Sequence, residues 1–73
     1  MGEVTARIED QVRSWISSGE LAPGARLPSE REMAQTLGAG RTTIRLVLVK
    51  LTAEGLIEAQ HGRGYFVRQA VQS

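Results

Sequence analysis

Apolar residues recur at helical spacing in the first part of the chain. Between about residues 4 and 18 they share one face, and charged or small polar residues fill the positions between them. The apolar face consists of Val4, Ile8, Val12, Trp15 and Ile16. This pattern predicts an amphipathic helix, and Gly19 is suited to the left-handed conformation that ends one.

Two more helices are predicted after a turn at Pro23-Gly24 and a short segment, residues 25–27, that favours a minimal first strand. Ser29 and Glu32 have the spacing of a capping box, in which each side chain bonds the other residue's backbone amide. The second helix therefore starts here, and Gly38 ends it. Its apolar positions are Met33, Ala34 and Leu37.

The third helix is predicted from about Arg41 to Glu54, with Gly55 as its stop. Its apolar stripe contains Ile44, Val47, Leu48 and Leu51. Only a short glycine-containing turn separates it from the second helix, and two helices joined in this way form a helix-turn-helix.

The last part of the chain has the pattern of a β-hairpin. Residues 56–60 and 65–68 are strand-like, and His61-Gly62-Arg63-Gly64 between them provides a glycine-bearing loop. Such a hairpin after a helix-turn-helix is a wing. Residues 1–68 are accordingly predicted to form one domain, and residues 69–73 to be its C-terminal end or the start of a linker.

Composition limits what a chain of 73 residues can do. It has room for one small domain with a modest core, and with no cysteine neither disulfides nor thiolate ligands can supplement that core. The net charge is only +1, but it is unevenly distributed. Residues 1–30 carry three arginines against five acidic residues, and residues 31–73 carry six basic residues against three acidic ones. A surface that faces phosphates is therefore expected from the second part.

Several segments together resemble the GntR family of bacterial regulators. They are residues 27–34, Gly38, residues 41–45, Leu48, Leu51, residues 54–57 and residues 62–67. The resemblance spans nearly the whole chain and is specific, because the Leu-Pro-Ser-Glu-Arg box, the Arg-Thr-Thr helix start and the glycine-bounded wing tip occur in order at the family's spacings. It implies a winged helix-turn-helix: mainly helical, with three helices and a wing sheet of two or three strands. It also implies a separate C-terminal effector-binding domain, absent from this chain, to which residues 69–73 would begin the linker. The resemblance further implies binding as a homodimer, on DNA or through that absent domain, to a palindromic or near-palindromic operator in double-stranded DNA.

The start of the third helix carries the candidate DNA-reading residues. A recognition helix presents its N-terminal side chains to the major groove, and Arg41, Thr42, Thr43 and Arg45 occupy that end. The arginine guanidinium can donate two hydrogen bonds to guanine, which makes Arg45 the main candidate for base reading. The resemblance assigns DNA contacts to the positions of Arg31, Arg41, Thr43 and Arg45. From the sequence alone, Arg31 either reaches DNA or pairs with a neighbouring glutamate.

The wing tip supplies a second set of candidates. His61, Gly62 and Arg63 lie where small residues let the backbone approach phosphates and a basic side chain can enter the minor groove. The resemblance places the positions of His61 and Gly62 in or near that groove, and the alternative for His61 is a residue that only fills the turn. Ser29 and Glu32 are assigned mainly to stability as the helix cap.

Other residues are expected to be structural or differ from the family pattern. The spacing predicts that Trp15, Ile44, Leu48, Leu51 and Phe66 belong to the core, whereas Tyr65 either packs partly exposed or contacts the DNA backbone. Gly40 replaces the usual serine or threonine before Arg41. Leu46 and Val49 replace polar residues, and they either pack against a second domain or dimer mate or are ordinary scattered surface residues.

Other classes of protein are less consistent with the sequence. A winged-helix module that binds protein is compatible with the low net charge, but it gives the arginines of the third helix no special reason to be there. An enzyme is not expected, because no nucleophile, base and orienting group can be assembled. No cofactor or metal is expected either, since there is one histidine and no cysteine. The absence of an apolar run of about 20 residues argues against a membrane span, and a cytoplasmic protein is expected.

Overall fold

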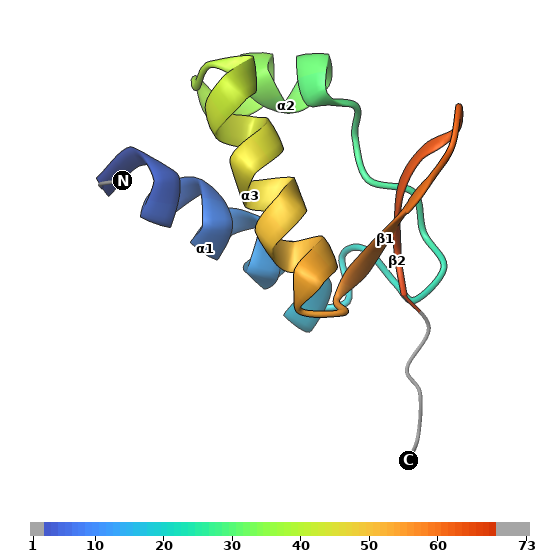
Figure 1. The fold of residues 1–73 in the computed structure, drawn as a ribbon. Coiled ribbons are helices and arrows are strands. Elements are labelled where there is room, and N and C mark those ends of the chain that lie inside the picture. Colours follow the sequence, from blue (N-terminus) through green and yellow to red (C-terminus); the bar gives the residue numbers. More distant parts are fainter. Residues whose placement is uncertain (1–2, 69–73) are drawn as a thin grey trace.

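The computed structural model describes residues 3–68 as three helices followed by a two-stranded antiparallel sheet (Figure 1). In chain order the elements are α1 (Glu3–Ser17), α2 (Glu30–Leu37), α3 (Arg41–Ala53), β1 (Ile57–Gln60) and β2 (Gly64–Val67). The predicted fold class, mainly helical with a small hairpin, is confirmed. The predicted tail or linker at residues 69–73 lies outside the described residues.

The helix α1 forms where the apolar periodicity predicts it, one residue earlier at each end. Gly19 follows it with a φ of 88°, which a side chain would strain. Ile8 and Val12 are fully buried, whereas Val4 in the first turn is 51% exposed. The buried stripe of α1 is therefore narrower than its sequence suggests.

Local signals in the sequence determine where α2 and α3 begin and end. Both hydrogen bonds of the capping box between Ser29 and Glu32 are present at the start of α2, and Gly38 ends that helix with a φ of 68°. Gly40 stands before α3 in an extended conformation and provides no side-chain cap. As Figure 1 shows, α2 lies across the end at which α3 begins, and α1 and the hairpin lie on opposite sides of α3.

The hairpin pairs Ile57 with Val67 at its base and Gln60 with Gly64 beside the turn. The observed strands each lie within one residue of the predicted ones. The predicted first strand, residues 25–27, reduces to a single bridge between Arg26 and Phe66. The wing therefore has two strands and one bridging residue, within the predicted two or three.

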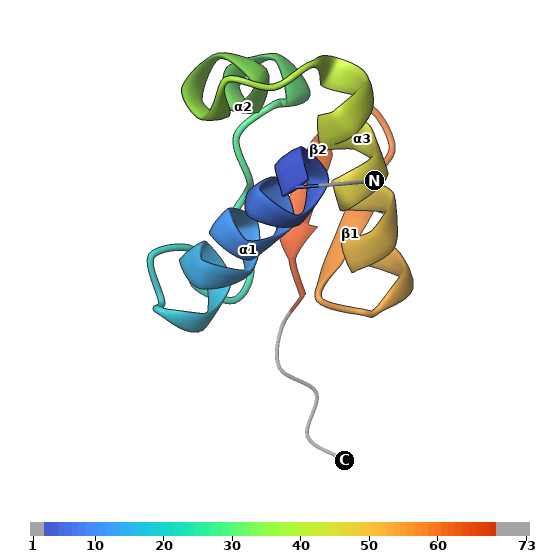
Figure 2. The same ribbon diagram turned by 90° about the vertical axis from the view of Figure 1, so that its left-hand side faces the viewer.

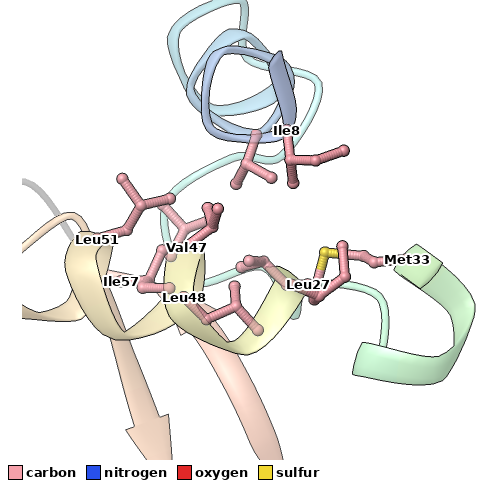
Figure 3. Packing of buried hydrophobic residues seen from close by; sticks show 10 residues of the cluster. Ile8, Leu27, Met33, Val47, Leu48, Leu51 and Ile57 are labelled. Carbon is pink, nitrogen blue, oxygen red and sulfur yellow. The ribbon is translucent and has the colours of Figure 1, made fainter. Parts of the chain in front are cut away.

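The core lies between the three helices and the sheet (Figure 3). Figure 2, which views the molecule from the side of α1, shows that helix in front of the sheet. Every element and the segment before α2 contribute to the core. Its buried residues are Ile8, Val12, Leu27, Met33, Ile44, Val47, Leu48, Leu51, Ile57 and Val67.

The core assignment of Phe66 is wrong, although that of Ile44, Leu48 and Leu51 is confirmed. Side chains alternate across a strand, and Val67 is the fully buried residue of β2. Tyr65 shares the face of Val67 and packs against the core, so Phe66 lies on the opposite face and is only half-buried. Tyr65 is thus the partly exposed packing residue that was one of its two predicted alternatives.

The core assignment of Trp15 is confirmed only in part, because this residue packs against the cluster but is half-buried. It lies in the last turn of α1. Two residues earlier, Arg13 pairs with Glu54, which immediately follows the end of α3. Trp15 thus follows the contact of α1 with the end of α3 in the sequence, and its side chain is only partly covered by the core.

Candidate nucleic-acid interface

The first turns of α3 expose the residues predicted to read DNA. Arg41 and Arg45 are one turn apart, and their side chains are 61% and 60% exposed. Thr42 is exposed as well, whereas Thr43 is half-buried. The two arginines therefore share one open helix face, and Thr43 presents less of its side chain to solvent than Thr42 does.

A carboxylate from α2 lies behind these arginines. The Nε and Nη2 atoms of Arg45 donate hydrogen bonds of 3.2 and 2.9 Å to the two carboxylate oxygens of Glu30. The Nη2 atom of Arg41 is 3.8 Å from the same carboxylate. These contacts, chiefly the hydrogen bond from Arg45, lower the pKa of Glu30 from its ordinary value. Glu30 is therefore ionised at neutral pH and joins the start of α2 to the start of α3.

An open hollow of about 260 Å³ lies between the start of α2, the start of α3 and the start of β2. Its charged lining residues are Arg26, Glu30, Arg31 and Arg41. Arg31 is exposed and extends from the first turn of α2. The sequence left open a pairing of Arg31 with a neighbouring glutamate; among residues 3–68 the ion pairs of Glu30 are with Arg41 and Arg45 instead.

The wing tip exposes the second set of predicted residues. His61, Gly62 and Arg63 form the turn between β1 and β2, and all three are exposed. Gly62 has a φ of 75°, so the turn requires a residue that tolerates the left-handed region. The Arg63 amide closes the turn by donating to the Gln60 carbonyl at 2.8 Å. The wing tip points towards the end of the molecule at which α2 lies and α3 begins (Figure 1).

This geometry agrees with the comparisons with known protein families. The model of the bacterial regulatory proteins of the gntR family matches residues 4–67. The chain belongs to the GntR family.

Two bacterial transcriptional regulators match most of this chain at 43% and 46% identity. The transcriptional repressor NagR of Bacillus subtilis is 46% identical over 61 residues, which are 84% of this chain and 25% of NagR. An uncharacterized regulator of Mycobacterium tuberculosis, Rv0494, is 43% identical over 65 residues, 89% of this chain and 27% of that protein. The chain thus spans about a quarter of the length of these relatives, which are named as transcriptional regulators.

Solved structures show the same fold. AraR(DBD) in complex with operator ORX1 superposes with a TM-score of 0.86 and 34% identity, over 92% of this chain and 81% of that one. The winged helix-turn-helix predicted from the resemblance to the GntR family is therefore confirmed.

Two residues that line the hollow, Arg26 and Glu30, were not predicted from the sequence as candidate site residues. Arg26 lies on the bridge to β2, and a Cβ atom on Gly64 would come within 3.2 Å of its Nε atom, so its side chain lies across the start of β2. The alternation between Arg26 and the buried Leu27 could have indicated that Arg26 faces outwards. Glu30 offered no such signal, because an acidic residue in a first helical turn is ordinarily a solvated residue that favours the helix dipole.

A second group of ion pairs connects α1 with the far end of α3. Glu9 accepts from Arg13 at 2.6 Å and from Lys50 at 3.1 Å, and Arg13 also donates to Glu54 at 2.7 Å. The hydrogen bond from Arg13, followed by that from Lys50, lowers the pKa of Glu9. Four charged side chains thus neutralise one another at the contact between these two helices.

Two searches of residues 3–68 bear on other classes of function. No group of three or more histidine or acidic side chains there is arranged to hold a metal ion. Nor does that part of the chain contain a helix with the length and apolar character of a membrane span.

Proposed function

We propose that this domain binds double-stranded operator DNA sequence-specifically, as the DNA-binding part of a GntR-family transcriptional regulator. The observation that carries the proposal is the position of Arg41 and Arg45, largely exposed at the end of the molecule to which the wing tip also extends (Figure 1). Crystal structures of AraR(DBD) in complex with operators ORX1, ORE1 and ORR3 support the proposal, since that domain shares the fold of this chain.

In this proposal α3 enters the major groove and the wing reaches the adjacent minor groove. Arg45 reads a guanine through two hydrogen bonds to O6 and N7, and Arg41 contacts a base edge or a phosphate nearby. The hydroxyl groups of Thr42 and Thr43 suit phosphates, and their methyl groups suit thymine. Because Thr43 is half-buried and Thr42 is exposed, the side chain of Thr43 extends less far towards the DNA.

Residues outside α3 fix the register of the domain on the duplex. Arg31 extends from α2 towards a phosphate beside the major groove, and His61, Gly62 and Arg63 approach the minor groove from the wing tip. Arg26 lines the hollow between α2 and β2 and adds a further phosphate contact beside the start of β2. Phosphate contacts of this kind supply affinity and orientation, while the base contacts of α3 supply sequence preference.

The proposal includes an assembly of two copies, which the resemblance to the GntR family supports. Two copies occupy the half-sites of a palindromic or near-palindromic operator, and they associate on DNA or through an effector-binding domain outside this chain. Such a regulator acts in the cytoplasm and performs no catalysis. The alternative function is that of a winged-helix module that binds a protein partner. The following experiment distinguishes between the two functions.

Fluorescence anisotropy tests the proposal with a duplex selected from a random pool and a scrambled duplex of equal composition. We expect the wild type to prefer the selected duplex and to bind more weakly as salt rises. Arg45→Ala should lose about 1–3 kcal/mol per site, or roughly 5- to 150-fold, on the selected duplex and little on the scrambled one. Arg68→Ala, at the end of β2 remote from the tip, is the matched control. If the wild type binds no duplex at low salt, the proposal fails and a protein partner should be sought.

A further inference from the structure

The contact between Glu30 and Arg45 uses one particular edge of the guanidinium group. Its Nε–H and one Nη2–H point to the two carboxylate oxygens, at 3.2 and 2.9 Å. A guanidinium has five N–H donors, so one N–H on Nη2 and both on Nη1 remain available. The free N–H on Nη2 and one of the two on Nη1 form the end of the side chain, the edge opposite its aliphatic stem. Glu30 therefore occupies the side of the fork and leaves its tip free.

The free tip matches the hydrogen-bonding pattern of guanine. Guanine presents the O6 and N7 acceptors next to each other in the major groove, and two N–H groups on neighbouring nitrogens can bond them together. The Glu30 side chain is 19% exposed and that of Arg45 is 60% exposed. The carboxylate thus lies behind the guanidinium, where it does not compete with a base for the tip.

The same carboxylate restricts what else Arg45 can do. An unpaired arginine on a helix surface samples many rotamers and can follow any nearby phosphate, whereas two hydrogen bonds to a fixed carboxylate select one orientation. Glu30 itself is fixed, because it lies in the first turn of α2, next to the Ser29 cap. Its negative charge also offsets part of the attraction of Arg41, 3.8 Å away, for phosphates.

We propose that Glu30 is a positioning residue that sets the base specificity of the domain, by holding the Arg45 guanidinium end-on for one guanine and weakening its attraction to phosphates of any sequence. This inference rests on the proposed DNA binding by α3. It makes a distinct claim, namely that a carboxylate that repels DNA phosphates improves discrimination between sequences.

The test is a base-by-base measurement of specificity. Each position of the selected half-site is replaced in turn by the other three bases, and the Kd of each duplex is measured for the wild type, Arg45→Ala and Glu30→Gln. The position that Arg45→Ala makes indifferent to sequence identifies the guanine. We expect Glu30→Gln to reduce the preference for guanine at that position by about fivefold or more. The base preferences at all other positions should stay within about twofold of the wild-type values. Its affinity for the scrambled duplex should stay equal or rise.

Two further variants separate positioning from effects on charge or folding. Glu20→Gln removes one negative charge from an exposed loop and should leave the whole specificity profile unchanged. Glu30→Asp keeps the charge at the start of α2, but its shorter side chain reaches one donor of Arg45 instead of two. We expect an intermediate loss of preference at the same position. Circular dichroism verifies that each variant has the wild-type helix content.

The outcomes discriminate between the inference and the function on which it depends. If the wild type shows no sequence preference, the proposed function fails. If Arg45→Ala abolishes the preference at one position but Glu30→Gln does not, or weakens all positions equally, Glu30 has no positioning role. Tighter specific binding by Glu30→Gln with the guanine preference intact would show that Glu30 masks Arg45, which overturns the inference. Unfolding of both Glu30 variants would overturn it too, because Glu30 would then be needed for folding.

Discussion

Replacement of Arg26 by alanine tests whether the hollow beside the start of β2 holds a DNA phosphate. The side chain of Arg26 lines that hollow together with Arg31 and Arg41, and it is fixed across the start of β2 beside Gly64. Among residues 3–68, Arg26 takes part in no ion pair that would offset its charge. Its charge is therefore available to a phosphate in a way that the charge of Arg45, paired with Glu30, is not.

The expected magnitude follows from counterion release. Each phosphate that a protein neutralises on duplex DNA changes the slope of log K against log salt by about −0.9. Arg26→Ala should therefore make the slope shallower by about 0.9. Between 50 and 200 mM salt, the wild type should lose roughly 3.5-fold more affinity than the variant. The ratio of selected to scrambled affinity should not change, since a phosphate contact carries no base information.

Anisotropy titrations on both duplexes at four salt concentrations measure the slope. Arg68→Ala serves as the control, because it also removes one arginine, at the end of β2 where the Arg68 amide donates to the Leu56 carbonyl at 3.0 Å. Its slope should equal that of the wild type. An Arg26→Ala slope that equals the wild-type slope would refute the phosphate contact, and a loss of sequence preference would indicate that Arg26 reads a base.

Two predictions concern stability. Leu48→Ala removes a side chain with 0% exposure from the centre of the core, so urea unfolding should show a loss of about 2–5 kcal/mol; a loss below about 1 kcal/mol would contradict the packing described here. Glu9→Gln tests the ion pairs between α1 and α3: because the folded-state pKa of Glu9 is lowered, the stabilisation is present above the unfolded-state pKa and is lost as pH falls through the folded one. The difference in Tm between wild type and Glu9→Gln should therefore be largest at pH 7 and shrink by about pH 3, and a difference independent of pH would refute the linkage.

The sequence predicted element boundaries well because the signals that determine them are local. The capping box at Ser29, the left-handed stop at Gly38 and the turn at Gly62 each depend on residues a few positions apart. The family resemblance added the arrangement of the elements in space. Together they placed nearly every boundary within one residue.

The errors arose where tertiary packing decides the outcome. Whether Tyr65 or Phe66 faces the core depends on the register of β2, which Val67 fixes by pairing with the buried Ile57. The contact between Glu30 and Arg45 spans 15 residues and two helices, and no spacing rule for a single helix predicts it. The charge environment of the candidate reading residue was therefore the part of the site that required the structure.

The ion pairs also explain how a domain with a net charge of +1 can present a basic surface. Glu9 and Glu54, two of its eight acidic residues, pair with Arg13 and Lys50 at the contact between α1 and α3. This pairing neutralises charge away from the start of α3. Near that start, three further arginines accompany Arg45: Arg26, Arg31 and Arg41. Since fields act over about a Debye length of 8–10 Å, this local excess governs the approach to DNA more than the net charge does. Glu30 is an acidic side chain that lies among these arginines, and for that reason its removal should leave the affinity for unrelated sequences equal or raise it, while it weakens the choice between sequences.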